Sequence, residues 1–323
     1  MSKPIAIVAG EPNSISSEII FKSWKLRKKF IHKPFLVIGS IDLLNLQKKQ
    51  LKYKIKMKKI NDDFKKSDLM GRELPIYDIK YFQRKSFEKI SDKSNKYIFK
   101  CFNLAIKLTK INKIRGFLNC PVAKETLFKK KHQGITEFLS KKYGARGNEV
   151  MLIYNKELSV SPMTTHIPLS QVNRKINKSQ IIKKVKIIDK FYKEILKQKP
   201  NIAILGLNPH NFSSSKRFEK TKIIKKAIKT LKKNKVKVFG PVSPDSSFMS
   251  FNKSKFNVIV GMYHDQVLTP FKAIYNFNAI NITLGLPYIR ISPDHGVAKN
   301  IVGKRIANPS SLIESIKFFN LIK

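Results

Sequence analysis

Short apolar runs alternate with longer amphipathic segments along the whole chain. The short runs are rich in β-branched residues and have the length of strands, whereas the longer segments repeat apolar residues at helical spacing. This alternation predicts an α/β protein. Strands are expected at residues 5–9, 35–39, 51–56, 76–81, 116–120, 151–154, 158–163, 202–205, 236–239, 257–262 and 279–284. Helices are expected at residues 16–29, 95–109, 180–197, 220–232 and 311–322.

Two α/β lobes are expected, because 323 residues exceed the ~100 to 200 residues of an ordinary single domain. The chain contains no internal repeat and no disordered linker, so interleaved lobes are expected rather than two domains in series. We place the first lobe at residues 1–130 together with 290–323, and the second lobe at residues 131–289. The active site is expected in the cleft between the lobes.

The apolar stretches are too short for a membrane protein. The longest reach about half of the ~20 residues that a membrane-spanning helix needs. The N-terminus lacks the basic region, apolar stretch and cleavage site of an export signal, so we expect a cytoplasmic protein without membrane contact. Cys101 and Cys120 are the only cysteines and have no metal-binding spacing, so both are expected to be buried thiols.

Basic residues far outnumber acidic residues. The chain has 66 lysine and arginine residues against 21 aspartate and glutamate residues, which gives a formal net charge of +45. Only nine of the basic residues are arginine, and the 57 lysines are spread through helices and loops. A nucleic-acid site more often contains arginine forks, clustered aromatic residues or a known module, and none is found here. The charge therefore favours a solvated lysine coat over a nucleic-acid surface.

Three of the six histidines, His166, His210 and His264, follow predicted strands. Ligands of open α/β sheets bind beyond the carboxyl ends of the strands. Three imidazoles can hold a divalent transition metal and leave one coordination position free for a substrate. No local motif joins the three histidines, so spacing alone also allows each to be an ordinary polar residue at a strand end.

Two aspartates occupy similar positions in the chain. Asp245 lies in GPVSPDSSF, and Asp265 directly follows His264 in a predicted loop. Either carboxylate can complete a metal shell or orient a ligating imidazole through its second ring nitrogen. Aspartate is also a favoured turn residue, so a turn-capping role remains open for both.

Cationic residues near strand ends are candidates for holding an anionic substrate, and they are Lys124, Lys272 and Arg290. Arg290 is the most informative, because arginine is scarce in this chain and its planar fork matches carboxylate and phosphate oxygens. Asn281 and Thr283 alternate on one face of the strand that leads to Arg290. The chain has no GxGxxG fingerprint and no GxxxxGK loop, so its motifs alone give only a weak indication of a nucleotide cofactor.

Seven short motifs follow one another along nearly the whole chain. They are GEP (10–12), TTHIPL (164–169), GLNPH (206–210), GP with PD (240–245), YHDQ (263–266), NITLGLPYIR (281–290) and DHG (294–296). Together they resemble the 4-hydroxythreonine-4-phosphate dehydrogenase (PdxA) family of vitamin B6 biosynthesis. The combination of GLNPH, YHDQ and NITLGLP is the specific part of this resemblance.

The resemblance implies the two-lobed α/β/α architecture of isocitrate and isopropylmalate dehydrogenases. It also implies a homodimer whose active sites use residues from both subunits. A divalent metal, Zn, Mg or Co, would bind to His166, His210 and His264. The phosphorylated substrate would contact Thr136, Lys272, Asn281 and Arg290. Lys272 and Asp245 are the candidate catalytic residues, and the cofactor-binding residues are not assigned.

The implied reaction is a metal-dependent oxidation of 4-phosphohydroxy-L-threonine by NAD or NADP. It gives a β-keto acid, which loses carbon dioxide to form 3-amino-2-oxopropyl phosphate in the biosynthesis of pyridoxal phosphate. The chain departs from the family pattern at Ile135, where GHTEF has a histidine, and at 211–215, where the family has a glycine-rich stretch.

Two alternatives follow from these departures and from the charge. Loss of an imidazole changes polar recognition, so the chain can be a related dehydrogenase for another phosphorylated hydroxy acid, such as 4-phosphoerythronate or phosphothreonate. An alternative of another class is a catalytically inactive, lysine-rich nucleic-acid-binding protein.

A metal site shared between subunits gives an expectation for mixed dimers. If the shell of His166, His210 and His264 is shared between subunits, mixing His166→Ala protein with His264→Ala protein should restore one of the two sites. If the ligands come from one subunit, both sites should stay broken in every hybrid.

Overall fold

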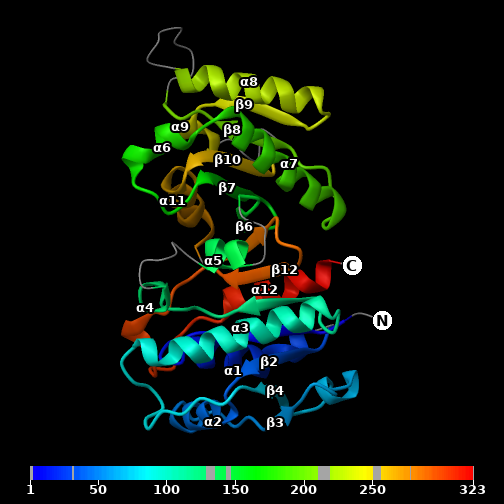
Figure 1. Ribbon diagram of the computed structural model, residues 1–323, viewed down its shortest axis with the longest axis vertical. Coiled ribbons are helices and arrows are strands. Elements are labelled where there is room, and N and C mark those ends of the chain that lie inside the picture. Colours follow the sequence, from blue (N-terminus) through cyan, green and yellow to red (C-terminus); the bar gives the residue numbers. More distant parts are fainter. Residues whose placement is uncertain are drawn as a thin grey trace. The chain divides into compact units, whose positions relative to one another are not determined.

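The chain folds into two α/β units. The structure is a computed structural model, and it describes residues 3–30, 33–128, 135–142, 147–209, 219–249, 256–276 and 278–322. Unit 1 comprises Met1–Gln133 and Tyr288–Lys323, and unit 2 comprises Gly134–Pro287. The lobe boundaries predicted from the sequence lie at 130/131 and 289/290. Each unit has a sheet with helices packed on it (Figure 1), which confirms the predicted α/β class.

The described strand pairs of unit 1 are all parallel, and the strand order is β3-β4-β2-β1-β5-β12. The strands are β1 (Ile5–Val8), β2 (Phe35–Gly39), β3 (Met57–Ile60), β4 (Leu74–Asp78), β5 (Gly116–Asn119) and β12 (Ile289–Pro293). The α-helices are α1 (Ser16–Leu26), α2 (Ile41–Gln50), α3 (Asn95–Lys110), α4 (Lys124–Phe128) and α12 (Ser310–Leu321). Short 3-10 turns lie at η1 (Arg27–Lys29), η2 (Lys66–Leu69), η3 (Asp92–Ser94) and η5 (Lys299–Ile301).

The central strands of unit 1 consist almost entirely of apolar residues, and every residue of β1, β2 and β5 is buried. Such continuous apolar runs are typical of parallel sheets, in which helices cover both faces. Helix α3 packs on these three strands, and α12 packs on β12. Helix α2 begins after Ser40, whose hydroxyl oxygen accepts a hydrogen bond from the backbone N–H of Leu43 (3.3 Å).

The strand order in unit 2 is β11-β6-β7-β10-β8-β9. Strands β7, β10, β8 and β9 are parallel neighbours, whereas β6 pairs antiparallel with both β7 and β11. The strands are β6 (Val150–Tyr154), β7 (Ser159–Thr164), β8 (Ile202–Leu205), β9 (Val238–Val242), β10 (Val258–Tyr263) and β11 (Ile280–Leu284). The helices are α5 (Ile135–Lys142), α6 (Leu169–Lys175), α7 (Lys178–Glu194), α8 (Glu219–Lys233), α9 (Pro244–Ser247) and α11 (His264–Tyr275).

Helix α11 packs against β7 and β10 in the core of unit 2. Its residues Val267, Leu268 and Phe271 are buried, in one cluster with Val160 of β7 and Ile259 of β10. Burial of each such side chain stabilises the fold by roughly 1.5 to 3 kcal/mol. The packing fixes α11 along its apolar face, and the first turn of the helix therefore lies at the carboxyl end of β10.

The predicted strand at residues 51–56 is wrong, because this segment connects α2 to β3 and the strand begins only at Met57. The alternating apolar residues of this segment imitate a strand. However, the N–H of Leu51 still bonds the carbonyl of Gln47 (2.9 Å), and Lys52 has a φ of 54°. The chain therefore turns at this point. Helices α2, α5, α6, α9 and α11 and strand β12 were not predicted.

Candidate metal and substrate site

The carboxyl ends of β7, β10 and β8 meet at one edge of the unit 2 sheet. The three strands are parallel neighbours, with β10 in the middle. Thr164, the last residue of β7, lies opposite Tyr263, the last residue of β10. Because His166 and His264 lie within two residues of these strand ends, the topology brings two of the three predicted metal ligands to the same edge of the sheet.

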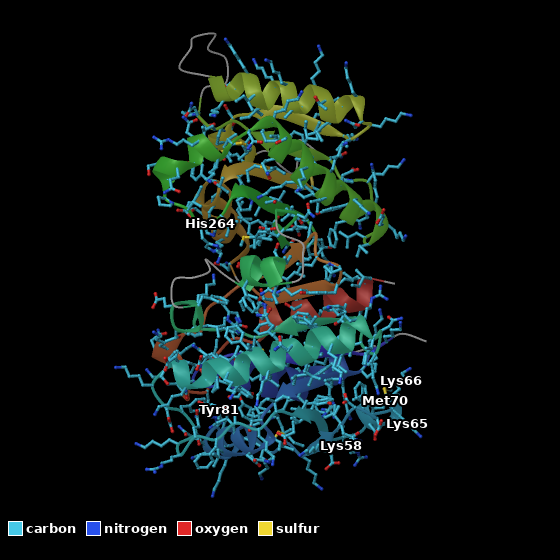
Figure 2. The ribbon with its side chains drawn as sticks, viewed as in Figure 1. Lys58, Lys65, Lys66, Met70, Tyr81 and His264 are labelled. Carbon is cyan, nitrogen blue, oxygen red and sulfur yellow. The ribbon has the colours of Figure 1, made fainter. Side chains whose placement is uncertain are left out.

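The imidazole rings of His166 and His264 lie side by side. Their ring centroids are 6.0 Å apart, and the ring planes are inclined by 39°. His166 follows β7 after one intervening residue, whereas His264 is the first residue of α11 (Figure 2). Both side chains are partly exposed. The sequence analysis expected a loop after β10, but Asp265 lies in the first turn of α11.

A pocket of about 260 Å³ lies against these two rings. It is lined by Thr165, His166, Ile167, Leu169, Val172, Tyr263, His264 and Asp265. The lining combines polar groups from both strand ends with apolar residues from the segment that begins α6. A small pocket with a few converging polar groups is typical of a site for a small ligand.

Asp265 engages one of the two ring nitrogens of His264. The distance between His264 Nδ1 and Asp265 Oδ1 is 2.6 Å. A carboxylate at this nitrogen favours the tautomer in which Nδ1 carries the proton. This arrangement leaves Nε2 of His264 as the nitrogen with a free lone pair, as found in ligating histidines that are oriented by a carboxylate.

The two imidazoles fit a divalent metal by their donor type and their spacing. Two rings that share one tetrahedral ion, at about 2.0–2.1 Å from each nitrogen, would have centroids roughly 5 Å apart. The observed 6.0 Å is close to that value. Imidazole nitrogen suits Zn or Co, whereas Mg prefers oxygen ligands.

A third ligand is not provided by the described residues, among which no group of three or more histidine, cysteine, aspartate or glutamate side chains is arranged to hold a metal. The third predicted ligand, His210, lies outside the described residues. The described chain reaches Pro209, four residues after the end of β8.

Lys272 and Asp245 are not among the residues that line the pocket beside the two imidazoles. Lys272 is exposed in the last turn of α11, about 12 Å along the helix axis from His264. Asp245 is exposed in the first turn of α9, where its Oδ1 accepts a hydrogen bond from the backbone N–H of Ser246 (2.8 Å). The side chain of Thr136, at the start of α5, lies outside the described residues.

Asn281 in β11 has an unusual environment. Its Oδ1 is buried and has no hydrogen-bond partner among the described residues. A buried acceptor without a partner is costly, by about 1 to 3 kcal/mol. Such an atom is suited to receive a hydrogen bond from a bound molecule.

Arg290 lies in β12 of unit 1, not in a loop. Its side chain is buried, and its Nε donates a hydrogen bond to Asn119 Oδ1 at the end of β5 (2.7 Å). This bond fixes the plane of the guanidinium group. A planar, fixed guanidinium can bind a carboxylate or phosphate through two parallel hydrogen bonds.

The cysteines are buried, as predicted, and both thiols are free. Burial raises the pKa of the Cys101 thiol to about 12 and also raises the pKa of the Cys120 thiol. A thiol ligates metal as the thiolate, so neither cysteine is suited to this role at neutral pH.

Lysines are exposed on both units, as expected for a solvated coat. Lys186 and Lys190 lie on the exposed face of α7. Figure 2 shows Lys58, Lys65 and Lys66 close together in unit 1, where Lys58 forms an ion pair with Asp68 at 3.1 Å.

Two features of the site were missed by the sequence analysis. One is the pocket contribution of Tyr263, and the other is Gln266, whose buried side chain contacts two strand ends. Both residues belong to the YHDQ motif, so the motif was the available signal. The role of each depends on neighbouring strands and could not be derived from spacing.

Comparison with known proteins identifies the class of molecule that this fold and site define. A family profile described as "Pyridoxal phosphate biosynthetic protein PdxA" matches residues 31–319. Relatives named 4-hydroxythreonine-4-phosphate dehydrogenase occur in Sulfurihydrogenibium sp. (strain YO3AOP1) and Aquifex aeolicus (strain VF5). Each is 36% identical, and the alignments cover 99% and 98% of this chain and 98% and 97% of the relatives. The chain therefore belongs to the PdxA family.

Solved structures agree with this assignment. The crystal structure of 4-hydroxythreonine-4-phosphate dehydrogenase from Klebsiella pneumoniae is 27% identical and has a TM-score of 0.84, covering 99% of this chain and 97% of that chain. A terephthalate 1,2-cis-dihydrodiol dehydrogenase from Burkholderia xenovorans LB400, with 16% identity and a TM-score of 0.66, shares the fold alone.

Family membership confirms several expectations. The predicted resemblance to the PdxA family and the predicted α/β dehydrogenase fold are confirmed. The predicted function, an oxidoreductase of pyridoxine biosynthesis, is favoured over the alternative of a nucleic-acid-binding protein. The family implies an NAD(P) cofactor and a divalent metal in general. Among the helices described, none combines the length and apolar character needed to cross a membrane.

Proposed function

We propose that this chain catalyses the metal-dependent oxidation of 4-hydroxythreonine 4-phosphate by NAD or NADP. The reaction takes place where β7, β10 and β8 end in unit 2. The observation that carries this proposal is the pair of imidazoles of His166 and His264, 6.0 Å apart at a pocket, in a chain of the PdxA family.

The proposed metal ligands are His166, His264 and His210, of which the third is assigned from the GLNPH motif alone. The bond between His264 Nδ1 and Asp265 supports Nε2 as the ligating atom of His264. When bound, a divalent cation supplies Lewis acidity toward the substrate hydroxyl, and NAD(P) accepts the hydride.

The remaining predicted residues bind and orient the substrate. Arg290, whose guanidinium plane is fixed by Asn119, is assigned to an anionic group of the substrate. Asn281, with its buried acceptor, is assigned to a substrate hydroxyl or ammonium group. Lys272 and Thr136 complete the set by family resemblance, and fixed orientation of the reacting groups lowers the barrier.

The substrate carbon that bears the hydroxyl loses a hydride to NAD(P)⁺, and the hydroxyl loses a proton, which leaves a ketone β to the carboxylate. Cleavage of the bond to the carboxylate then releases carbon dioxide and, after proton uptake, leaves 3-amino-2-oxopropyl phosphate. Lys272 and Asp245 are the proposed groups for proton transfer, on the basis of the family resemblance.

A second substrate is supported by one observation. Ile135 occupies the position of the histidine in GHTEF and is buried at the start of α5, with 5% exposure. An apolar side chain there cannot hydrogen-bond the substrate as an imidazole does. The second candidate is therefore oxidation of a related phosphorylated hydroxy acid, such as phosphothreonate or 4-phosphoerythronate.

The test is oxidation of a substrate panel by purified protein. We expect reduction of NAD or NADP, measured by absorbance, with 4-hydroxythreonine 4-phosphate in the presence of Zn or Co. Phosphothreonate and 4-phosphoerythronate are assayed in parallel, and the largest kcat/KM identifies the substrate. Absence of reduction with all three acids, both nucleotides and each metal would contradict the proposal.

The homodimer with shared active sites is also part of the proposal, on the basis of the resemblance. Sedimentation of the purified protein should give about twice the chain mass of 37.3 kDa. A monomer with full activity would contradict shared sites.

A further inference from the structure

A chain of buried hydrogen bonds joins the ends of β7, β10 and β8. The hydroxyl of Thr164 in β7 donates to the carbonyl oxygen of Met262 in β10 (2.9 Å). The N–H of Met262 donates to Oε1 of Gln266 (2.6 Å). Nε2 of Gln266 donates to the carbonyl oxygen of Gly206, directly after β8 (2.8 Å). Two side chains thus connect three neighbouring strand ends.

The chain of hydrogen bonds lies in the interior of unit 2. All participating residues of the chain of bonds are buried, so each bond is shielded from water.

Gly261 makes room for the amide of Gln266. A Cβ atom at Gly261 would lie 2.9 Å from Gln266 Oε1 and 2.5 Å from Val267 Cγ1. No real Cβ atom approaches its neighbours to 2.5 Å, so a side chain at position 261 would displace the first turn of α11. The backbone of β10 is therefore shaped to receive Gln266.

The joined strand ends are those that carry the proposed metal ligands. Thr164 precedes His166 by two residues, and Met262 precedes His264 by two residues. Gly206 begins the described loop that leads along the chain toward the GLNPH histidine. Gln266 also lies in the same helical turn as His264, so its two bonds restrain the start of α11.

We infer that Gln266, together with Thr164, is a positioning residue that holds the strand-end loops at the separation needed by the metal site before the metal binds. This inference rests on the proposed function, because it assumes that the histidines after these strands are ligands. If the ligands are held in place before the metal binds, binding does not have to order the loops. The conformational entropy lost on binding is then smaller, and the metal affinity is higher.

The test compares metal affinity with stability in three variants of unit 2. Gln266→Met keeps the length of the side chain and removes both hydrogen bonds. Gln266→Glu keeps an oxygen acceptor for the Met262 N–H and removes the donor to Gly206. The matched control is Tyr192→Phe, which removes a buried hydrogen bond to Ser159 Oγ (2.8 Å) at the opposite end of β7.

Binding of Zn²⁺ and Co²⁺ to the metal-free proteins is measured by competition titration, and unfolding is measured by thermal scans without metal. We expect Gln266→Met to lower metal affinity by about 10- to 100-fold, as loss of an outer-shell partner does. Gln266→Glu should give a loss in the same direction. Tyr192→Phe should lower the Tm by about as much as Gln266→Met does. Its metal affinity should stay within about twofold of that of the wild type.

Thr164 provides a second test in case Gln266→Met does not fold. Thr164→Val keeps the side-chain shape and removes the donor to Met262, whereas Thr164→Ser keeps the hydroxyl. We expect weaker metal binding in the valine variant and recovery in the serine variant. In the metal-free protein, amide exchange at Met262 should be faster in Gln266→Met than in Tyr192→Phe, because only the methionine variant removes the acceptor of the Met262 N–H.

The possible failures are distinguishable. If His166→Ala and His264→Ala lose metal while the Gln266 and Thr164→Val variants bind it as the wild type does, the positioning inference is wrong and the proposed site stands. If the two histidine variants bind metal normally, the proposed site is wrong and the inference falls with it.

Discussion

The two units use polar residues after their central strands in opposite ways. In unit 1, Glu11 follows β1 and is 1% exposed; its Oε1 accepts a hydrogen bond from the N–H of Asn13 (3.2 Å), and its Oε2 accepts one from the hydroxyl of Ser94 (3.2 Å). In unit 2, His166 and His264 follow β7 and β10, are partly exposed and line a pocket. The same position in an α/β sheet thus carries a buried, hydrogen-bonded carboxylate in one unit and two partly exposed imidazoles at a pocket in the other.

This difference teaches how to separate structural from chemical polar groups. A buried group whose partners lie within the protein contributes to stability, and its removal costs about 1 to 3 kcal/mol when the partner is left unpaired. An accessible imidazole contributes little to stability, but it retains a lone pair for a ligand. Variants in the two units should therefore differ in which property they change.

The largest expected effect is on metal binding in unit 2. His166→Ala and His264→Ala should each lower metal affinity by more than the roughly 100-fold that loss of an outer-shell partner costs, and activity should fall with it. The matched change in unit 1 is Asn13→Ala, which removes an acceptor for Gln83 Nε2 (3.2 Å) and for the N–H of Glu88 (2.7 Å).

Asn13→Ala should lower the free energy of unfolding by about 1 to 3 kcal/mol and leave metal affinity unchanged. Metal titration and denaturant unfolding of all three variants measure both properties. The comparison between the units breaks down if the histidine variants bind metal as well as the wild type does. His132→Ala is the control, because His132 lies outside the motifs that resemble the PdxA family. It should lower metal affinity much less than the other two histidine variants do.

The second prediction concerns mixed dimers. His166 and His264 of one chain have ring centroids only 6.0 Å apart, so we expect one subunit to supply both ligands of a site. Hybrids of His166→Ala with His264→Ala should therefore stay inactive. If the partner subunit supplies the third ligand, mixing His166→Ala with His210→Ala restores one of the two sites. The measurement is activity after subunit exchange has been verified.

Rescue in the His166→Ala and His264→Ala hybrids would contradict a pair within one chain. Absence of rescue in the hybrids that contain His210→Ala, with subunit exchange demonstrated, would show that the third ligand is not supplied by the partner.

Much of the site's location was predictable from the sequence, because it depends on strand order and strand ends. His166 and His264 each follow a strand. If these two strands are parallel neighbours, both histidines must lie at the same edge of the sheet. The sequence could not supply that neighbour relation, since β7 and β10 are separated by about 100 residues. Only the resemblance of the motifs to the PdxA family indicated that the histidines after these two strands lie close together.

The features that the sequence did not predict depend on tertiary contacts. Leu51 belongs to the alternating pattern that imitates a strand, and only its bond to Gln47 shows that it is the C-cap residue of α2. Likewise, the side chain of Gln266 has a role only because β8 lies next to β10. Arg290 was identified by residue type, but its burial beside Asn119 follows from the pairing of β12 with β5.

The third prediction sharpens the comparison at the orienting carboxylate. The Asp265 side chain is 79% exposed, so its loss should hardly change stability. Asp265→Ala removes the partner of His264 Nδ1 and should lower metal affinity by about 10-fold. Asp265→Asn keeps an oxygen acceptor and should retain most of the affinity. Equal affinity in Asp265→Ala and the wild type would show that the carboxylate does not orient the ligand.

The smallest expected effect lies in unit 1 and concerns pH. Burial raises the pKa of Glu11 above its ordinary value of 4.5, although the N–H of Asn13 and the hydroxyl of Ser94 act in the opposite direction. Between 4.5 and the higher pKa of the folded state, the folded protein binds more protons than the unfolded chain. The stability that protonated Glu11 contributes is therefore present at low pH and is lost as the pH rises through the folded-state pKa.

Glu11→Gln removes this titration and keeps one oxygen acceptor at the site. The variant should be more stable than the wild type at pH 7 to 8, and the difference should narrow as the pH falls toward 4.5, because the wild-type carboxyl then becomes neutral as well.

Glu18→Gln is the matched control, because Glu18 is equally buried but pairs with Lys22 at 2.8 Å. Neutralising Glu18 should therefore lower the stability of the protein. Denaturant unfolding at several pH values measures both differences. A Glu11→Gln variant that is less stable than the wild type at pH 7 would contradict this prediction. It would show that the hydrogen bonds from Asn13 and Ser94 stabilise the ionised carboxylate by more than its burial destabilises it. The cluster in unit 1 would then depend on a charged group, as the proposed metal site in unit 2 does.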